Sequence, residues 1–262
     1  MTPLKHVVQY SGGAGSWAAA KRVAQLRGTE NLILLCANTN SEGDDWLEFV
    51  ETSAANVGGE LVMVDNGGRT TWDLFNEQNM IGSDRVPICS RMLKSEPLKK
   101  WMEANCDYTK TIMYFGFDWT EEHRLERTRP HWEPWTIEAP LICTPYVHKA
   151  DLFAMLEAEG LKVPKLYTQG FPHNNCGGAC VKAGQGAWKR LLEFYPERFA
   201  EEEAQEKAFR ERTGKDVAIL FVVRDGERVP LPLQGFRKEL EAVAEPSFLD
   251  LDDWGSCGCF TD

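Results

Sequence analysis

The stretch that decides the fold reads HVVQY (6–10), SGGAGS (11–16) and WAAAKRVAQLR (17–27). The first segment is a short β-prone run, the second is a glycine-rich turn, and a helix is expected from Ser16 to about Arg27. Glycines let the backbone turn sharply and approach an anion, and the N–H groups at a helix start carry partial positive charge. The sequence therefore predicts a strand–loop–helix unit whose loop binds phosphate. An ordinary tight turn between a strand and a helix is the alternative interpretation.

Strands and helices continue to alternate after this unit. We expect further strands at 32–37, 60–64, 111–117 and 137–142, and helices at 44–57 and 95–104. The run LILLCA (32–37) is apolar throughout, as a parallel strand buried on both faces should be. This alternation predicts an α/β fold with three α/β/α layers and a mostly parallel sheet in residues 1–145.

The second part of the chain, 146–262, has a different character. It contains predicted helices at 149–159, 187–195 and 196–212, and a glycine- and cysteine-rich loop at 172–186. Two β-prone runs flank Asp225-Gly226, a dipeptide typical of a tight hairpin turn. We expect a small cysteine-bearing C-terminal extension here.

Composition limits the function classes. The chain has 262 residues, is 43% hydrophobic and carries a formal net charge of −11. Such an acidic protein repels duplex phosphates, which argues against non-specific duplex binding but not against a small nucleic acid on a local basic patch. No stretch approaches the ~20 apolar residues of a membrane helix, and the N-terminus lacks the apolar run of a signal peptide. We therefore expect a cytoplasmic protein without a membrane partner.

The motif YSGGAGS (10–16) resembles the SGGxDS signature of the PP-loop ATP pyrophosphatase superfamily, which includes PAPS (phosphoadenosine-phosphosulfate) reductases, tRNA-thiolating enzymes and DndC-like DNA-phosphorothioation enzymes. The resemblance implies an adenine-nucleotide α-hydrolase-like fold. It also implies cleavage of ATP between the α and β phosphates, with transfer of AMP to a substrate oxygen. The residues that would hold the nucleotide at this motif are Ser11, Gly12, Gly13, Gly15 and Ser16.

One position departs from the motif: Gly15 stands where the superfamily has an aspartate that helps to manage Mg²⁺. Either another acid does this work or the nucleotide is bound without being cleaved. The segment ANTNSE (37–42) resembles the one that the superfamily uses beside the nucleotide, which makes Asn38, Thr39 and Glu42 nucleotide-site candidates. Glu42, Asp44 and Asp45 are the candidate replacement acids, because they follow the second predicted strand and ligands of open α/β sheets bind at the carboxyl ends of strands. An acidic helix start that suits the helix dipole is the alternative for these acids.

A second block, CSRMLKSEPL (89–98), resembles the C-x-x-x-x-K-x-x-P-L block of the PAPS reductase and DndC-like branch, of the kind found in phages. Arg91 and Lys94 would face anionic groups, and Cys89 falls where some members hold an iron–sulfur cluster. The segment GFDWTEEHR (116–124) resembles the family's G-x-x-x-x-E-x-x-R segment and makes Arg124 a second candidate for stabilising charge on the transferred phosphoryl group. For the block at 89–98, a cationic helix start on a solvated face is the alternative interpretation.

The cysteines suggest a metal site. Cys176 and Cys180 flank small residues that let a backbone wrap a metal, and Cys257 and Cys259 form a second pair. Spacing alone leaves Zn²⁺ and a [4Fe–4S] cluster both open. By resemblance to DndC-like proteins, the ligands would be Cys89, Cys176, Cys180 and Cys257. Cys259 would then be a free thiol that carries sulfur, although the two C-terminal cysteines can exchange roles.

Three functions stay open from the sequence. The first is ATP-dependent adenylation, coupled to sulfur transfer or to modification of a nucleotide or nucleic acid acceptor. The second is PAPS reduction, which the tail SCGCF (256–260) disfavours because it lacks the Glu and His of the E-C-G-x-H motif. The third is a nucleotide-binding module without chemistry, which Gly15 supports. The superfamily often forms homodimers, so a homodimer is compatible with any of them.

Overall fold

The N-terminal strand, loop and helix form as predicted. The computed structural model describes residues 4–83, 85–242 and 249–253. Strand β1 (Lys5–Gln9) leads through the glycine-rich turn into helix α1 (Ala14–Arg27). Gly12 has a φ of +77°, and an added Cβ there would lie 2.3 Å from Nε1 of Trp46, so only glycine fits this turn.

The central sheet has five parallel strands in the order β3-β2-β1-β4-β5. The other strands are β2 (Leu32–Ala37), β3 (Glu60–Val64), β4 (Thr111–Tyr114) and β5 (Thr136–Glu138). The chain winds outward from β1 through β2 and β3, and then returns to place β4 on the other side of β1. This crossing creates a switch point between β1 and β4, where open α/β sheets bind ligands.

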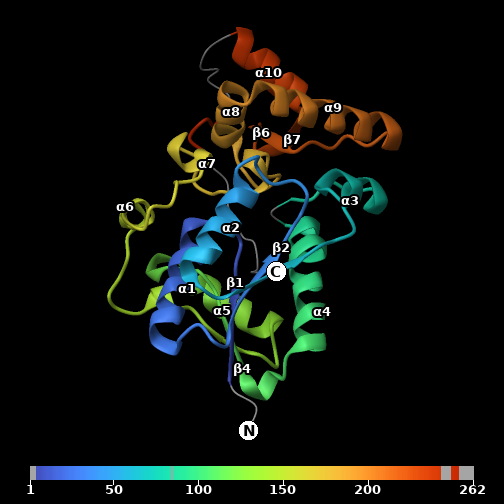
Figure 1. Cartoon of the computed structure of the whole chain (residues 1–262). Coiled ribbons are helices and arrows are strands. Elements are labelled where there is room, and N and C mark those ends of the chain that lie inside the picture. Colours follow the sequence, from blue (N-terminus) through green and yellow to red (C-terminus); the bar gives the residue numbers. More distant parts are fainter. Residues whose placement is uncertain (1–3, 84, 243–248, 254–262) are drawn as a thin grey trace.

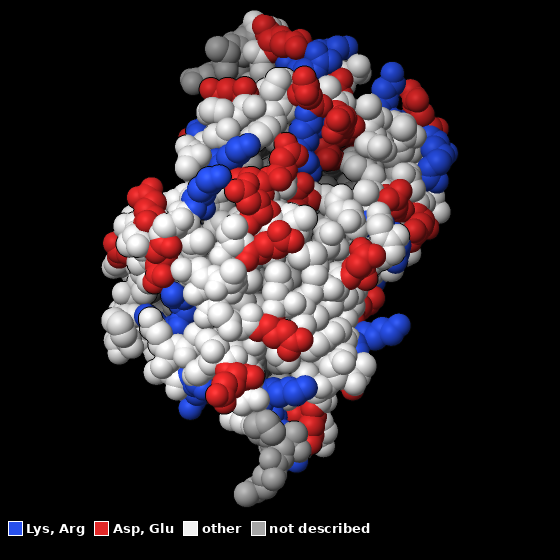
Figure 2. Space-filling model, viewed as in Figure 1, with Lys and Arg blue, Asp and Glu red and all other residues white. Residues whose placement is uncertain are grey.

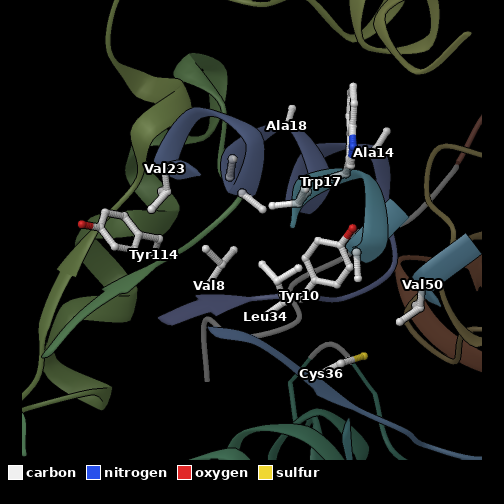
Figure 3. Close-up of a cluster of buried hydrophobic side chains, with 14 of the residues drawn as sticks. Val8, Tyr10, Ala14, Trp17, Ala18, Val23, Leu34, Cys36, Val50 and Tyr114 are labelled. Atoms are coloured by element: carbon white, nitrogen blue, oxygen red, sulfur yellow. The ribbon is translucent and has the colours of Figure 1, made fainter. Parts of the chain in front are cut away.

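Alternate strand residues face two separate cores, which makes the three predicted layers. Val8, Leu34 and Tyr114 face a core formed with α1 (Figure 3). Helices α2 (Trp46–Val57) and α6 (Lys149–Ala158) contribute to the same core. Val7 and Met113 face the opposite core, formed with α4 (Glu96–Asn105) and α5 (Glu122–His131). The predicted α/β fold class is therefore confirmed.

Some elements differ from the sequence-based expectation. The fifth strand ends at Glu138, and residues Pro140–Ile142 form a 3₁₀ turn, because Pro140 has no N–H to donate to a sheet. Helix α3 (Thr71–Gln78) was not expected, although Thr70 and Asp73 form a capping box at its start. Segment Ser90–Ser95 is a π-helical turn that leads into α4.

The C-terminal part lies at the end of the molecule opposite the N-terminus (Figure 1). Its elements are α7 (Lys165–Thr168), α8 (Gln185–Phe194), α9 (Pro196–Thr213), the antiparallel hairpin of β6 (Leu220–Arg224) and β7 (Glu227–Leu231), and α10 (Leu233–Ala242). Their apolar side chains share one core with Trp72 and Phe75 of α3 and with Leu93. The two parts of the chain are thus joined by a common core across the expected boundary at residue 145. Within the described residues, no helix is both long and apolar enough to cross a membrane.

Candidate functional site

A cleft of about 300 Å³ opens at the switch point between β1 and β4. One wall is the glycine-rich loop and the first turn of α1, and another is the segment Phe115–Asp118 that follows β4. A third wall comes from the distant segment Pro172–Asn175. The cleft is therefore assembled from parts of the chain that are more than 150 residues apart.

The first turn of α1 presents an anion-binding end to this cleft. The N–H groups of Ala14, Gly15 and Ser16 have no carbonyl acceptor within the helix, and the first turn carries no acidic residue. Ser16 was expected to offer its hydroxyl to a phosphate. Its Oγ instead donates to the carbonyl oxygen of Gly13 at 2.8 Å, so it stabilises the loop from within. Ser11 and Gly13 line the cleft as well.

Two side chains from elsewhere in the molecule hold the loop carbonyls. Nε1 of Trp46 donates to the Ser11 carbonyl oxygen at 3.0 Å, and Nδ2 of Asn174 donates to that of Gly12 at 2.9 Å. Both donor side chains are buried. The loop therefore has a defined shape before any anion arrives, so its N–H groups need little reorganisation on binding.

The glycine that replaces the motif aspartate makes a close backbone contact. A Cβ added at Gly15 would lie 3.0 Å from the Gly116 carbonyl oxygen, and one added at Gly116 would lie 2.8 Å from Ser16 N. The loop after β1 thus packs directly on the loop after β4. A side chain at position 15 would require the backbone at 116 to move, which gives a packing reason for glycine at this position.

Three basic side chains line the cleft: Arg124, Lys149 and His173. Arg124 contacts the Glu121 carboxylate, and its guanidinium lies 4.5 Å from the centre of the Phe117 ring. The amine of Lys149 donates to the Pro172 carbonyl oxygen. These contacts orient both cations, and the Arg124 candidate from the sequence is placed in the cleft beside the glycine-rich loop.

His173 is a neutral member of this group at pH 7. Although His173 is an exposed residue, the surrounding protein atoms lower its pKa to about 4, and the charges of Lys149 and Arg124 act in the same direction. Lys149 was missed by the sequence interpretation, which had treated it only as the start of a helix. No local pattern marks either residue, because Lys149 and His173 meet the loop only through the tertiary fold.

The remaining nucleotide-site candidates gather at a second place, after β2. Lys94 and Glu42 form a buried ion pair, with 3.4 Å between Nζ and Oε1. Thr39 donates to Oε1 of Glu42 at 2.9 Å, and the Cys176 N–H donates to Oε2 at 2.6 Å. Neither Lys94 nor Glu42 is among the described residues that line the cleft. The Lys94 charge is therefore balanced by one of the acids expected to replace the missing aspartate.

Two other candidates lie in structural or exposed positions. The Asn38 side chain accepts from Asn40 N at 2.9 Å and closes a local turn after β2. Arg91 is exposed and pairs with Glu96 at 3.3 Å. Both side chains are thus engaged with neighbours close in sequence.

The cysteines are only partly brought together. A hydrogen bond with the Cys180 thiol, burial and the Glu42 carboxylate raise the pKa of the Cys176 thiol. Cys89 instead packs against the C-terminal core. Over residues 4–83, 85–242 and 249–253, no group of three or more His, Cys, Asp or Glu side chains is arranged to hold a metal ion. Cys257 and Cys259 lie outside the described residues, so the four-cysteine site stays a prediction.

Arg198 of α9 stabilises the turn that carries Cys176. Cys176, Gly177 and Gly178 all have positive φ angles. Nη2 of Arg198 donates to the carbonyl oxygens of Ser41 at 2.6 Å and Cys176 at 3.1 Å. The guanidinium therefore ties the loop after β2 to the cysteine-bearing turn.

An aromatic cluster is formed by residues that are next in sequence to residues of the cleft lining. The Trp119 ring lies 5.6 Å from the ring centres of both Tyr146 and His148. Trp119 is 39% exposed and Tyr146 is 54% exposed. Arg22 holds the segment before Tyr146 by donating to the carbonyl oxygens of Pro140, Cys143 and Pro145.

Elsewhere, acidic and basic side chains are interspersed on the face shown in Figure 2.

The comparisons with known proteins find likenesses among solved structures. No protein-family model matches this chain, and no curated protein matches its sequence. A solved structure of a phosphoadenylyl-sulfate (PAPS) reductase from Candida auris, in complex with phosphate, is similar over 63% of this chain and 78% of its own, with a TM-score of 0.44 and 13% identity.

Proposed function

We propose that the protein binds ATP in the β1–β4 cleft and transfers its AMP group to an acceptor oxygen. The observation that carries this proposal is the convergence of the α1 N-terminus with Arg124 and Lys149 on one cleft at the switch point. A polyphosphate needs several positive groups at once, and this cleft supplies backbone N–H groups and two cations. The resemblance of residues 10–16 to the PP-loop signature supports ATP as the polyphosphate.

In the proposed reaction, the acceptor oxygen forms a bond to the α-phosphorus of ATP. The bond between that phosphorus and the bridging oxygen breaks, and its electron pair leaves with pyrophosphate. The N–H groups of Ala14, Gly15 and Ser16 would hold phosphate oxygens, while Arg124 would stabilise the charge that develops during transfer. The proton of the acceptor oxygen would pass to water, and His173, which is neutral at pH 7, can accept a hydrogen bond from the acceptor.

Magnesium would enter as the companion of ATP and neutralise part of its phosphate charge. The carboxylates that line the cleft are Asp118 and Glu121. Oδ1 of Asp118 accepts from Thr120 N at 2.8 Å, and Glu121 is paired with Arg124. These two residues are the ones that would contact the ion. An iron–sulfur cluster or a zinc ion needs several thiolate ligands, and the described residues bring together two thiols, those of Cys176 and Cys180. The proposed reaction therefore has no step that uses a cluster or zinc.

The test is pyrophosphate release from ATP, measured with Mg²⁺ and short single-stranded oligonucleotides as candidate acceptors. We expect release by the native protein, and a loss of about 100-fold in kcat for Arg124→Ala. Arg127→Ala is the matched control, because Arg127 is exposed on the same helix and does not line the cleft. Equal losses in both variants, or no binding of ATP by the native protein, would contradict the proposal.

A second candidate function is nucleotide binding without chemistry. The pairing of Glu42 with Lys94 favours it, because this acid, expected to replace the aspartate of the motif, is engaged outside the cleft. Binding of ATP with no pyrophosphate release, at any acceptor tested, would favour this candidate over adenylation.

A further inference from the structure

Gln9 is a polar side chain at the floor of the cleft with no described partner. It is the last residue of β1, it lines the cleft, and it is 2% exposed. Among the described residues, no hydrogen-bond partner is found for either its Nε2 or its Oε1. The residues before it in the strand, Val7 and Val8, are apolar and fully buried.

This arrangement is costly for the protein alone. A buried carboxamide gives up its hydrogen bonds to water and receives none in return, so an apolar side chain of the same size would favour folding. The Ser90 hydroxyl, which is also buried and has no partner among the described residues, does not line the cleft. Buried polar groups are normally satisfied, and at the floor of a cleft a bound molecule can satisfy them.

The chemistry of Gln9 differs from that of the rest of the cleft. The α1 N-terminus, Arg124 and Lys149 attract negative charge, whereas a carboxamide offers one donor and one acceptor side by side without charge. Phe115 and Phe117 also line the cleft, and their stacked rings lie 5.4 Å apart. An uncharged donor–acceptor pair beside apolar rings suits the edge of a planar heterocycle.

We propose that Gln9 recognises the base of the bound nucleotide: its Oε1 would accept a hydrogen bond from the amino group of an adenine edge, and its Nε2 would donate one to the neighbouring ring nitrogen. Gln forms such paired bonds with adenine in other recognition settings. The inference rests on the proposed binding of ATP in this cleft. Gln9 would then be a specificity-determining residue, separate from the groups that hold the phosphates.

The experiment compares ATP with purine riboside 5′-triphosphate, which lacks the 6-amino group but keeps the same phosphates. Dissociation constants are measured by calorimetry for the native protein, Gln9→Met and the buried control Ser90→Ala. We expect the native protein and Ser90→Ala to bind ATP about 10-fold more tightly than the purine analogue. In Gln9→Met that ratio should fall to about one, while inorganic tripolyphosphate binds all three proteins equally.

A second readout separates recognition from structure. Because Gln9→Met removes an unsatisfied buried amide, the ligand-free variant should melt about 2–4 °C higher than the native protein. A residue that serves binding at the expense of stability is expected to show this result: its replacement raises the melting temperature and removes the preference for ATP. Gln9→Asn, which keeps the amide but shortens its reach, should also lose the discrimination and serves as the binding test if Gln9→Met does not fold.

The outcomes distinguish this inference from the proposed reaction. If both Gln9 variants keep the native ratio between ATP and the analogue, the inference is wrong even where pyrophosphate is released. If the ratio depends on Gln9 but no pyrophosphate is released, base recognition stands and adenylation is wrong. If the native protein binds neither nucleotide, both proposals are wrong.

Discussion

At the scale of single residues, His173 gives the cleft a pH dependence. Its pKa of about 4 keeps the ring neutral in the free protein above about pH 5. A bound phosphate would favour the protonated ring and raise this pKa, so binding would take up a proton. The affinity for pyrophosphate should therefore rise as the pH falls from 7.5 towards 5.5.

The measurement compares pyrophosphate affinity at these two pH values in the native protein and in His173→Asn. Protonation of the ligand itself is common to both proteins and cancels in the comparison. We expect a steeper gain in affinity at low pH for the native protein. Identical pH profiles in the two proteins would show that His173 does not contact the anion.

The residue scale also shows what local sequence can and cannot predict about a site. The run from Ser11 to Ser16 was predictable because glycines between a strand and a helix have few other uses. Gln9 lies two positions earlier, but its proposed role in binding depends on its burial in the cleft, which no local sequence pattern reveals. Lys94 was predicted to face an anion, and it does, but the anion is Glu42 of the same chain. Pairing between distant charges is decided by packing rather than by spacing.

At the scale of elements, α9 supports two others through one buried carboxylate. Glu206 is 1% exposed, and it accepts from Ile219 N at 2.8 Å and from Leu233 N at 2.6 Å. It thereby links the approach to β6 with the start of α10. Burial raises the pKa of this carboxyl.

We expect Glu206→Ala to lower the free energy of unfolding by about 3 kcal/mol, because two buried N–H groups lose their acceptor. Glu211→Ala is the control on the same helix. Glu211 is exposed, and its ion pair with Lys207 is a long surface contact of 3.8 Å between Oε1 and Nζ. That change should cost less than about 0.5 kcal/mol. Urea denaturation measures both, and equal midpoints for the two variants would contradict the role given to Glu206.

The elements also differ in how readily they could be predicted. Strands β2 and β3 have the bounds expected from their apolar runs. Helix α3 is only 8 residues long, too short for its periodicity to stand out, and its capping box was the one available signal. Strand β5 is shorter than its apolar run because that run contains Pro140.

At the scale of the whole molecule, the two parts of the chain depend on one another. The core that contains Trp72, Phe75 and Leu93 is completed by side chains of α8, α9 and α10. A fragment of residues 1–145 would expose these apolar groups to water. We expect that fragment to aggregate or to lack cooperative unfolding, as measured by size-exclusion chromatography and circular dichroism. A monomeric fragment with a sharp melting transition would instead support an independent N-terminal domain.

The exposed ring of Trp119 has a practical consequence. Trp17, Trp132 and Trp188 are fully buried, whereas Trp119 stands 39% exposed beside Tyr146 and His148. A collisional quencher such as acrylamide will therefore reach Trp119 far more readily than those three indoles. The difference in fluorescence between the native protein and Trp119→Phe reports on this one position. The molecule thus carries its own optical reporter between two residues that line its cleft, Asp118 and Thr120, and binding there can be followed without attaching a dye.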